Sequence, residues 1–148
     1  MATTHFNGPV DSTNGFVTGT AGVASSVVSV TAGRTLTIAD HGKTFFLGDA
    51  ASGDITLPAV TLTGFYVKVI CGFTITTSSA VLSAEGDNIS GVFTVNGALI
   101  PALVEDQINF IANTALLGDW AEFTSTGAAW ATTGIGSAAG SITATDPA

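Results

Sequence analysis

The alternation of apolar and polar positions is most regular in residues 65–76. Successive side chains of a strand point to opposite faces, so this alternation predicts a strand with one buried face. The pattern pauses at Gly72 and then resumes, which predicts a pair of strands at the centre of the core. The expected buried face consists of Phe65, Val67, Val69 and Cys71, and the opposite face of Tyr66, Lys68 and Ile70.

Shorter apolar runs, separated by turn residues, predict further strands along the chain. The run at 92–95 ends at Asn96-Gly97, which is a strong hairpin signal. Residues 104–115 also fit a helical stripe, but the aromatic and β-branched residues among them favour a strand. Many short strands predict an all-β fold, namely a single β-sandwich or jelly-roll-like domain of short antiparallel strands. The expected strands are residues 35–39, 43–47, 54–57, 65–76, 81–83, 92–95, 107–112, 120–125 and 129–132.

The two ends of the chain differ in composition from the part between them. Residues 1–33 contain turn signals but no sustained period, and much of this stretch is Gly, Ala, Ser, Thr and Val. Free linkers rarely contain aromatic residues, so Phe6 and Phe16 favour an extended arm that a neighbouring chain orders. The sequence therefore predicts an N-terminal arm at 1–33, a β domain at 34–133 and a small-residue C-terminal tail at 134–148.

The chain is apolar and carries very little charge. Hydrophobic residues make up 46% of it and charged residues only 9%, against about 25% charged in a typical soluble domain. A surface of this kind loses little hydration when it packs, so it suits permanent contact with other chains. The formal net charge is −8, and Arg34, Lys43 and Lys68 are the only basic side chains apart from histidine. Three scattered cations argue against binding to nucleic acid or to an anionic membrane surface.

The sequence also bears on where the protein is made. Its N-terminus has no cationic start followed by an apolar run, which argues against a secretory signal peptide. Its apolar stretches fall well short of the roughly 20 residues that a membrane helix needs. We therefore expect a soluble protein made in a cytoplasm.

The residues that could carry chemistry are few and scattered. Cys71 falls on the expected buried face, where a thiol usually acts as a small hydrophobe. Asp40-His41 could imitate a base with its orienting carboxylate, but the sequence lacks the nucleophile elbow that would complete a catalytic set. Two histidines and one cysteine do not suit zinc, and the acidic loops near Asp49 and Asp87 favour turn chemistry over calcium. The expectation is a protein that is not an enzyme and uses no cofactor and no metal.

Two tryptophans offer another kind of site. Trp120 and Trp130 lie ten residues apart around a predicted turn. Together with Phe123 they could form a platform on which a sugar stacks. Aromatic residues in such an arrangement more often belong to a core or an interface, so sugar binding is the minor alternative.

Several segments resemble a known group of proteins. His5-Phe6-Asn7-Gly8-Pro9-Val10, followed by Ser12-Thr13-Asn14-Gly15-Phe16, is similar to the N-terminus of small capsid decoration (cement) and head-fibre proteins of tailed bacteriophages. Four later segments resemble the β domain of the same group, and together they extend the resemblance over most of the chain. These segments are residues 42–47, 54–58, 64–69 and 118–123.

The resemblance implies a structural virion protein without catalytic residues. It would sit on the outer surface of the capsid as a homotrimer at local three-fold positions and bind the major capsid protein and neighbouring copies of itself. The alternatives are a receptor- or glycan-binding module of a tail or head fibre and, least favoured, a small hydrolase. The residues expected to form the partner-binding arm are His5, Phe6, Asn7, Pro9, Val10, Asn14, Phe16 and Val17.

Overall fold

The computed structural model describes residues 27–86 and 88–146 of the chain. Within these ranges the protein forms twelve β-strands and one 3₁₀ turn, η1 (Ile38–Asp40), and no α-helix. The all-β prediction is therefore confirmed. The strand predicted at 107–112 instead of a helix is also confirmed, because β9 (Gln107–Phe110) forms there.

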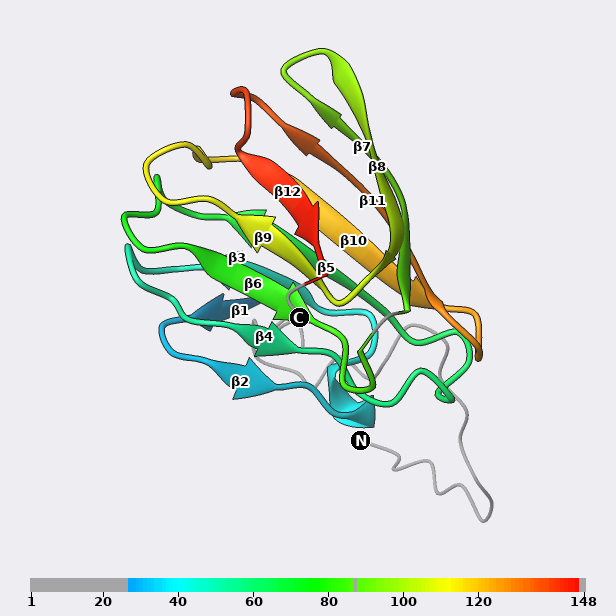
Figure 1. Ribbon diagram of the computed structural model, residues 1–148. Helices are drawn as coiled ribbons and strands as arrows, with labels where there is room; N and C mark the ends of the chain where they lie inside the picture. Colours follow the sequence, from blue (N-terminus) through cyan, green and yellow to red (C-terminus); the bar gives the residue numbers. More distant parts are fainter. Residues whose placement is uncertain (1–26, 87, 147–148) are drawn as a thin grey trace, which may run out of the picture.

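The strands form two sheets, one in front of the other in Figure 1. The larger sheet has the spatial order β1 (Val27–Val30), β3 (Thr44–Leu47), β5 (Tyr66–Cys71), β10 (Trp120–Ser125), β11 (Trp130–Gly136), β7 (Ile89–Val95) and β8 (Ala98–Glu105). The smaller sheet has the order β12 (Ile142–Thr145), β9, β6 (Ser79–Leu82), β4 (Ile55–Thr56) and β2 (Arg34–Thr35).

The first six strands wind back and forth between the two sheets. β1, β3 and β5 pair in parallel in the larger sheet, and β2, β4 and β6 pair in parallel in the smaller one. Each pass places its residues beside those of the pass before, so Val28, Phe45 and Val69 form one ladder. The prediction of antiparallel strands is wrong here. The turns between these strands carry the chain across to the other sheet, and it returns to each sheet in the same direction.

The remaining strands are mostly antiparallel. The predicted hairpin at Asn96-Gly97 is confirmed: it joins β7 to β8, and both turn residues have positive φ, 49° and 78°, as a two-residue hairpin turn requires. β10 pairs with β11 and also with β5, both antiparallel. One parallel pair, β11 with β7, joins the hairpin to the rest of the larger sheet.

A single hydrophobic core takes side chains from the inner faces of both sheets. Phe45, Phe93 and Phe123 from the larger sheet are fully buried, as are Ile108 and Phe110 from the smaller one. Val67, Val69 and Cys71 are also fully buried and Phe65 nearly so, which confirms the predicted buried face of this segment.

The second strand predicted within 65–76 does not form. The pairing of β5 with β3 ends at Cys71, and the Gly72 N–H makes a last hydrogen bond to the Leu47 carbonyl before the chain leaves the larger sheet. The amides of Thr76 and Thr77 then donate to the Ala50 carbonyl in a loop. The prediction of a strand pair was therefore wrong, and residues 72–78 connect the two sheets.

The β domain extends beyond the predicted range of 34–133 at both ends. β1 falls within the range assigned to the arm, and β12 falls within the range assigned to the tail. The strand expected at 35–39 is short, because Thr37 begins the 3₁₀ turn η1 and its own N–H donates to the Asp40 carboxylate. β8 lies where the sequence pattern predicted no separate strand.

Candidate interaction surfaces

The residues predicted to form the partner-binding arm all lie within residues 1–26, outside the described residues. The site prediction for the arm therefore stays a prediction. The described residues contain other groups that the sequence singled out, and these can be placed.

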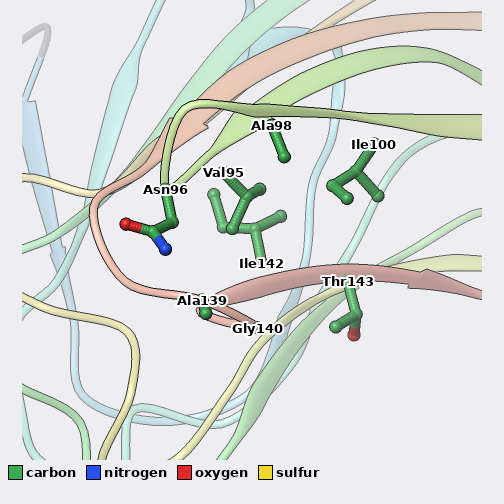
Figure 2. A pocket seen from close by; sticks show the side chains of 8 residues that line it. All are labelled: Val95, Asn96, Ala98, Ile100, Ala139, Gly140, Ile142 and Thr143. Atoms are coloured by element: carbon green, nitrogen blue, oxygen red, sulfur yellow. The ribbon is translucent and has the colours of Figure 1, made fainter.

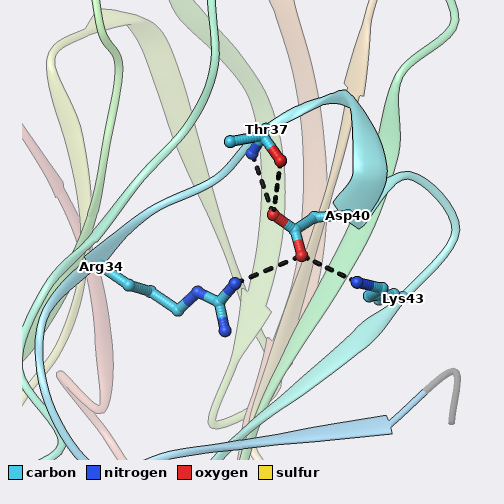
Figure 3. Close-up of polar contacts among 4 residues, drawn as sticks. All are labelled: Arg34, Thr37, Asp40 and Lys43. Carbon is cyan, nitrogen blue, oxygen red and sulfur yellow. Dashed lines mark hydrogen bonds and ion pairs between the residues drawn. The ribbon is translucent and has the colours of Figure 1, made fainter.

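Asp40 lies at the centre of a cluster of polar contacts between β2 and β3 (Figure 3). Its Oδ1 accepts from Arg34 Nη2 at 3.2 Å and from Lys43 Nζ at 2.9 Å, and its Oδ2 accepts from the Thr37 amide at 2.9 Å. Burial raises the pKa of this carboxyl, but the Thr37 hydrogen bond and the charges of Lys43 and Arg34 outweigh burial and lower it overall. Asp40 is thus held as a carboxylate that ties the chain together.

His41 and Cys71 are also used by the fold. His41 Nδ1 accepts the Tyr66 amide at 3.1 Å, and its ring lies 5.8 Å from that of Phe65. The Asp40 carboxylate is bonded to other residues, so the two neighbours do not form a base with its orienter. Burial, followed by the nearby charge of Asp119, raises the pKa of the Cys71 thiol to about 12. A thiol in that state is a poor nucleophile.

The acidic loops use their side chains to fasten backbone amides. Asp54 Oδ1 accepts the Ala80 amide at 2.8 Å, and Glu85 Oε1 accepts the Val60 amide at 3.1 Å. In the next turn, Asn88 Oδ1 accepts the Ser83 hydroxyl at 2.6 Å. Within residues 27–86 and 88–146, no group of three or more His, Cys, Asp or Glu side chains is placed to hold a metal ion.

The two tryptophans lie on opposite faces of the larger sheet. Trp130 is fully buried and meets the ring of Phe65 edge-on, with centroids 5.9 Å apart. Trp120 is partly exposed on the outer face, the face turned away from the smaller sheet, where Lys68 Nζ lies 3.7 Å from the centroid of its ring. A joint platform of both tryptophans, as the sequence suggested, is therefore impossible.

An apolar row crosses the outer face of the larger sheet near one end of its strands. The strand register places Phe46, Ile70, Trp120 and Ile135 opposite one another on successive strands, and Thr94 of β7 separates Ile135 from Leu99. Leu99 and Ile135 are 73% and 49% exposed. We call this row the outer band, and it consists of Phe46, Ile70, Trp120, Ile135 and Leu99.

A cleft of about 230 Å³ opens between the β7–β8 hairpin and the start of β12 (Figure 2). Its walls are apolar, and the polar side chain of Asn96 lies at the hairpin turn. A space of this size and character suits an apolar side chain better than a charged ligand. The residues that line it are Val95, Asn96, Ala98, Ile100, Ala139, Gly140, Ile142 and Thr143.

The sequence interpretation missed the apolar surface of β8. Leu99, Leu103 and Val104 are all more than half exposed. A signal was present, because an apolar run directly follows the turn residues Asn96-Gly97. Treating that run as the second strand of the hairpin would have identified both the strand and its exposed face.

No family model matches this chain, and no curated protein matches it. In the described part of the chain, no helix is long and apolar enough to span a membrane.

Proposed function

We propose that this chain is a structural virion protein, a decoration or cement protein on the outside of a tailed-phage capsid. The observation that carries the proposal is that the candidate reactive side chains make contacts within the fold. Asp40, His41 and Cys71, the best candidates for chemistry among the described residues, are all committed to contacts within the fold. What the described surface offers is apolar contact area, which suits assembly better than catalysis.

The arm would supply the contact with the coat subunits. Residues 1–26 precede β1, which is the terminal strand of the larger sheet. A segment of that length spans up to roughly 90 Å when fully extended, so it would reach well beyond its own domain. In this proposal Phe6 and Phe16 fill pockets on the major capsid protein or on neighbouring copies, and the backbone adds hydrogen bonds at a sheet edge.

The β domain would serve as the rigid base of the arm. We infer that its two sheets form a β-sandwich, because side chains from both contribute to one core. The expected homotrimer would present three arms at once. Several arms bound together gain avidity without any new contact per copy.

The proposal is tested by the binding of purified protein to capsids that lack it. Phe6→Ala combined with Phe16→Ala, and separately deletion of residues 1–17, should raise the dissociation constant for capsids at least about a hundredfold, because each of the two aromatic anchors contributes more than about 1.4 kcal/mol. Thr18→Ala combined with Thr20→Ala is the matched control within the same segment and should bind normally. Unchanged occupancy of both arm variants, with the β domain folded, would contradict the proposal.

A glycan-binding module is the second candidate, and one observation favours it. Trp120, Tyr66 and Glu122 share the outer face, and the Tyr66 hydroxyl donates to Glu122 Oε2 at 3.1 Å. Aromatic rings beside hydrogen-bonding groups suit the binding of a sugar. Binding on a glycan array that is lost with Trp120→Ala and kept with Thr124→Ala would support this function. Trp130→Ala is unsuitable for this test, because Trp130 belongs to the core.

A further inference from the structure

We propose that the outer face of the larger sheet is the contact surface for a second copy of this chain. The contact is centred on the outer band and is made by packing of side chains, without pairing of strand edges. The inference deepens the proposed function, and rests on it, by assigning the surface through which neighbouring copies meet.

Exposed apolar side chains are concentrated on this part of the larger sheet. Five of the ten large apolar side chains that are exposed among the described residues belong to the neighbouring strands β7, β8 and β11. The register continues this surface through Trp120 and Ile70 to Phe46 on β3. Exposed apolar side chains gathered on neighbouring strands mark an interaction site more often than scattered ones do. The five exposed residues are Val92, Leu99, Leu103, Val104 and Ile135.

The charge of this face selects the partner. Lys68 and Glu122 lie opposite each other on β5 and β10, beside the outer band, so their charges cancel. The whole chain carries −8, and two copies repel wherever their acidic surfaces approach. They can meet at low electrostatic cost on a neutral apolar face. A strongly basic partner would find no countercharge there, so a second copy fits this surface better.

The edge strand β8 is protected against the addition of another strand. Counting from the two-residue turn, Pro101 falls where an N–H would point away from β7, and proline has none. The Leu103 amide donates to Glu105 Oε1 at 3.2 Å, and the Val104 amide donates to Ser90 Oγ at 3.0 Å. Val104 has φ of 62°, which bends the strand at this point. The edge is therefore a poor template for another strand, and the face beside it is left for side-chain packing.

The size of the face is adequate for a specific contact. Seven strands at the usual spacing measure roughly 29 Å across, and six residues of strand measure roughly 20 Å, which gives about 580 Å² in projection. A specific interface needs at least about 500 Å² from each partner. Most of the outer face has to take part to reach that area, so a charge placed within the outer band should weaken the whole contact.

Sedimentation equilibrium of the isolated full-length chain tests this inference. The wild type should associate with increasing concentration, with masses that are multiples of 14.7 kDa. Ile135→Glu should raise the dissociation constant at least about tenfold, because it places an unpaired charge among the apolar side chains of the outer band. Leu99→Glu should act in the same direction and serves as the second variant if Ile135→Glu does not fold.

The matched control is Ile38→Glu, which adds the same charge at a more exposed isoleucine away from this face, 64% against 49% exposed. It should associate like the wild type. A monomeric wild type at all concentrations, or equal association of the wild type and both face variants, would overturn the inference. No capsid is present in this experiment, so its failure is distinct from failure of the occupancy experiment on the arm.

Discussion

The molecule contains two regions that build their sheets in different ways. Residues 27–82 wind between the sheets and pair in parallel, whereas residues 89–145 fold mostly as antiparallel neighbours. The two regions meet in both sheets, through β5 with β10 and through β6 with β9. The antiparallel region (residues 89–145) therefore continues both sheets beyond β5 and β6, the last strands of the winding region (residues 27–82). β1 and β2 are the terminal strands of the two sheets, and β1 begins directly after residues 1–26.

Although the chain carries few charges, polar contacts hold both regions in place. Polar side chains join the two regions: Tyr66 donates to Glu122 on the outer face, and the Ser125 hydroxyl donates to the Val60 carbonyl inside. The winding region has a tie of its own at Asp40, where two of the three Lys and Arg side chains of the chain meet. Because a common core joins both regions, they should unfold as one unit.

The largest expected effect comes from removing a large core side chain in either region. Phe45→Ala in the winding region and Phe123→Ala in the antiparallel region should each lower the free energy of unfolding by about 3–5 kcal/mol, because both side chains are fully buried. Calorimetry should show a single transition for each variant. Two separate transitions would show that the regions are independent, contrary to the shared core.

A smaller effect is expected where the β7–β8 hairpin joins the sheet. A Cβ at Gly91 would lie 1.8 Å from the Thr132 carbonyl oxygen, which is backbone and cannot turn aside. Gly91→Ala should therefore cost about 3 kcal/mol in denaturant unfolding. Gly140→Ala is the control, since its Cβ would meet nothing within 4 Å and only its φ of +73° is strained. It should cost about 1 kcal/mol. Equal costs would argue against the close β7–β11 contact.

The tie at Asp40 should make the stability of the whole fold sensitive to acid. Asp40→Asn should lower the free energy of unfolding at neutral pH by about 2 kcal/mol, since it removes a charge that accepts several hydrogen bonds. The pKa of Asp40 in the folded protein lies below its ordinary value of 3.8, so this contribution is complete above that value. It is lost as the pH falls through the lowered pKa. Denaturant unfolding of both proteins over a pH series would check this, and a difference that stays constant into strong acid would contradict it.

The smallest effect concerns the polar link on the outer face. Burial raises the pKa of Tyr66 above its ordinary value of 10.0, and the hydrogen bond to Glu122 and the charge of Glu122 raise it further. Glu122→Gln should lower this pKa, with little change in stability. Tyr66 is the only tyrosine, so near-ultraviolet absorbance reports its ionisation directly. Glu105→Gln is the control and should leave the titration of Tyr66 unchanged. An unaltered titration of Tyr66 in Glu122→Gln would contradict its hydrogen bond to Glu122.

The sequence predicts the elements of this fold better than their connections. Alternation around Val67 and Val69 identified a buried strand, and Asn96-Gly97 identified a hairpin, because both signals are local. The winding of the first six strands escaped prediction, since the same turn residues serve a hairpin and a crossing between sheets. Trp130 in the core and Trp120 outside could not be told apart without the register that fixes their faces.

The same limit applies to the surfaces. The hairpin signal could have identified β8, but the outer band could be traced only with the parallel pairing of β11 and β7, which places Leu99 in line with Ile135. The arm residues, by contrast, were predicted from composition and resemblance alone and lie outside the described residues. Surfaces depend on which strands are neighbours, and neighbours far apart in sequence leave no local pattern.

The proposed function predicts that this chain is part of tailed-phage particles, so counting its copies in purified particles tests the central claim most directly. Quantitative mass spectrometry would compare its abundance with that of the major capsid protein in the same particles. A decoration protein on the shell predicts a copy number of the same order as that of the coat subunits. Absence from the particle, or only a few copies in each, would contradict a role on the capsid surface.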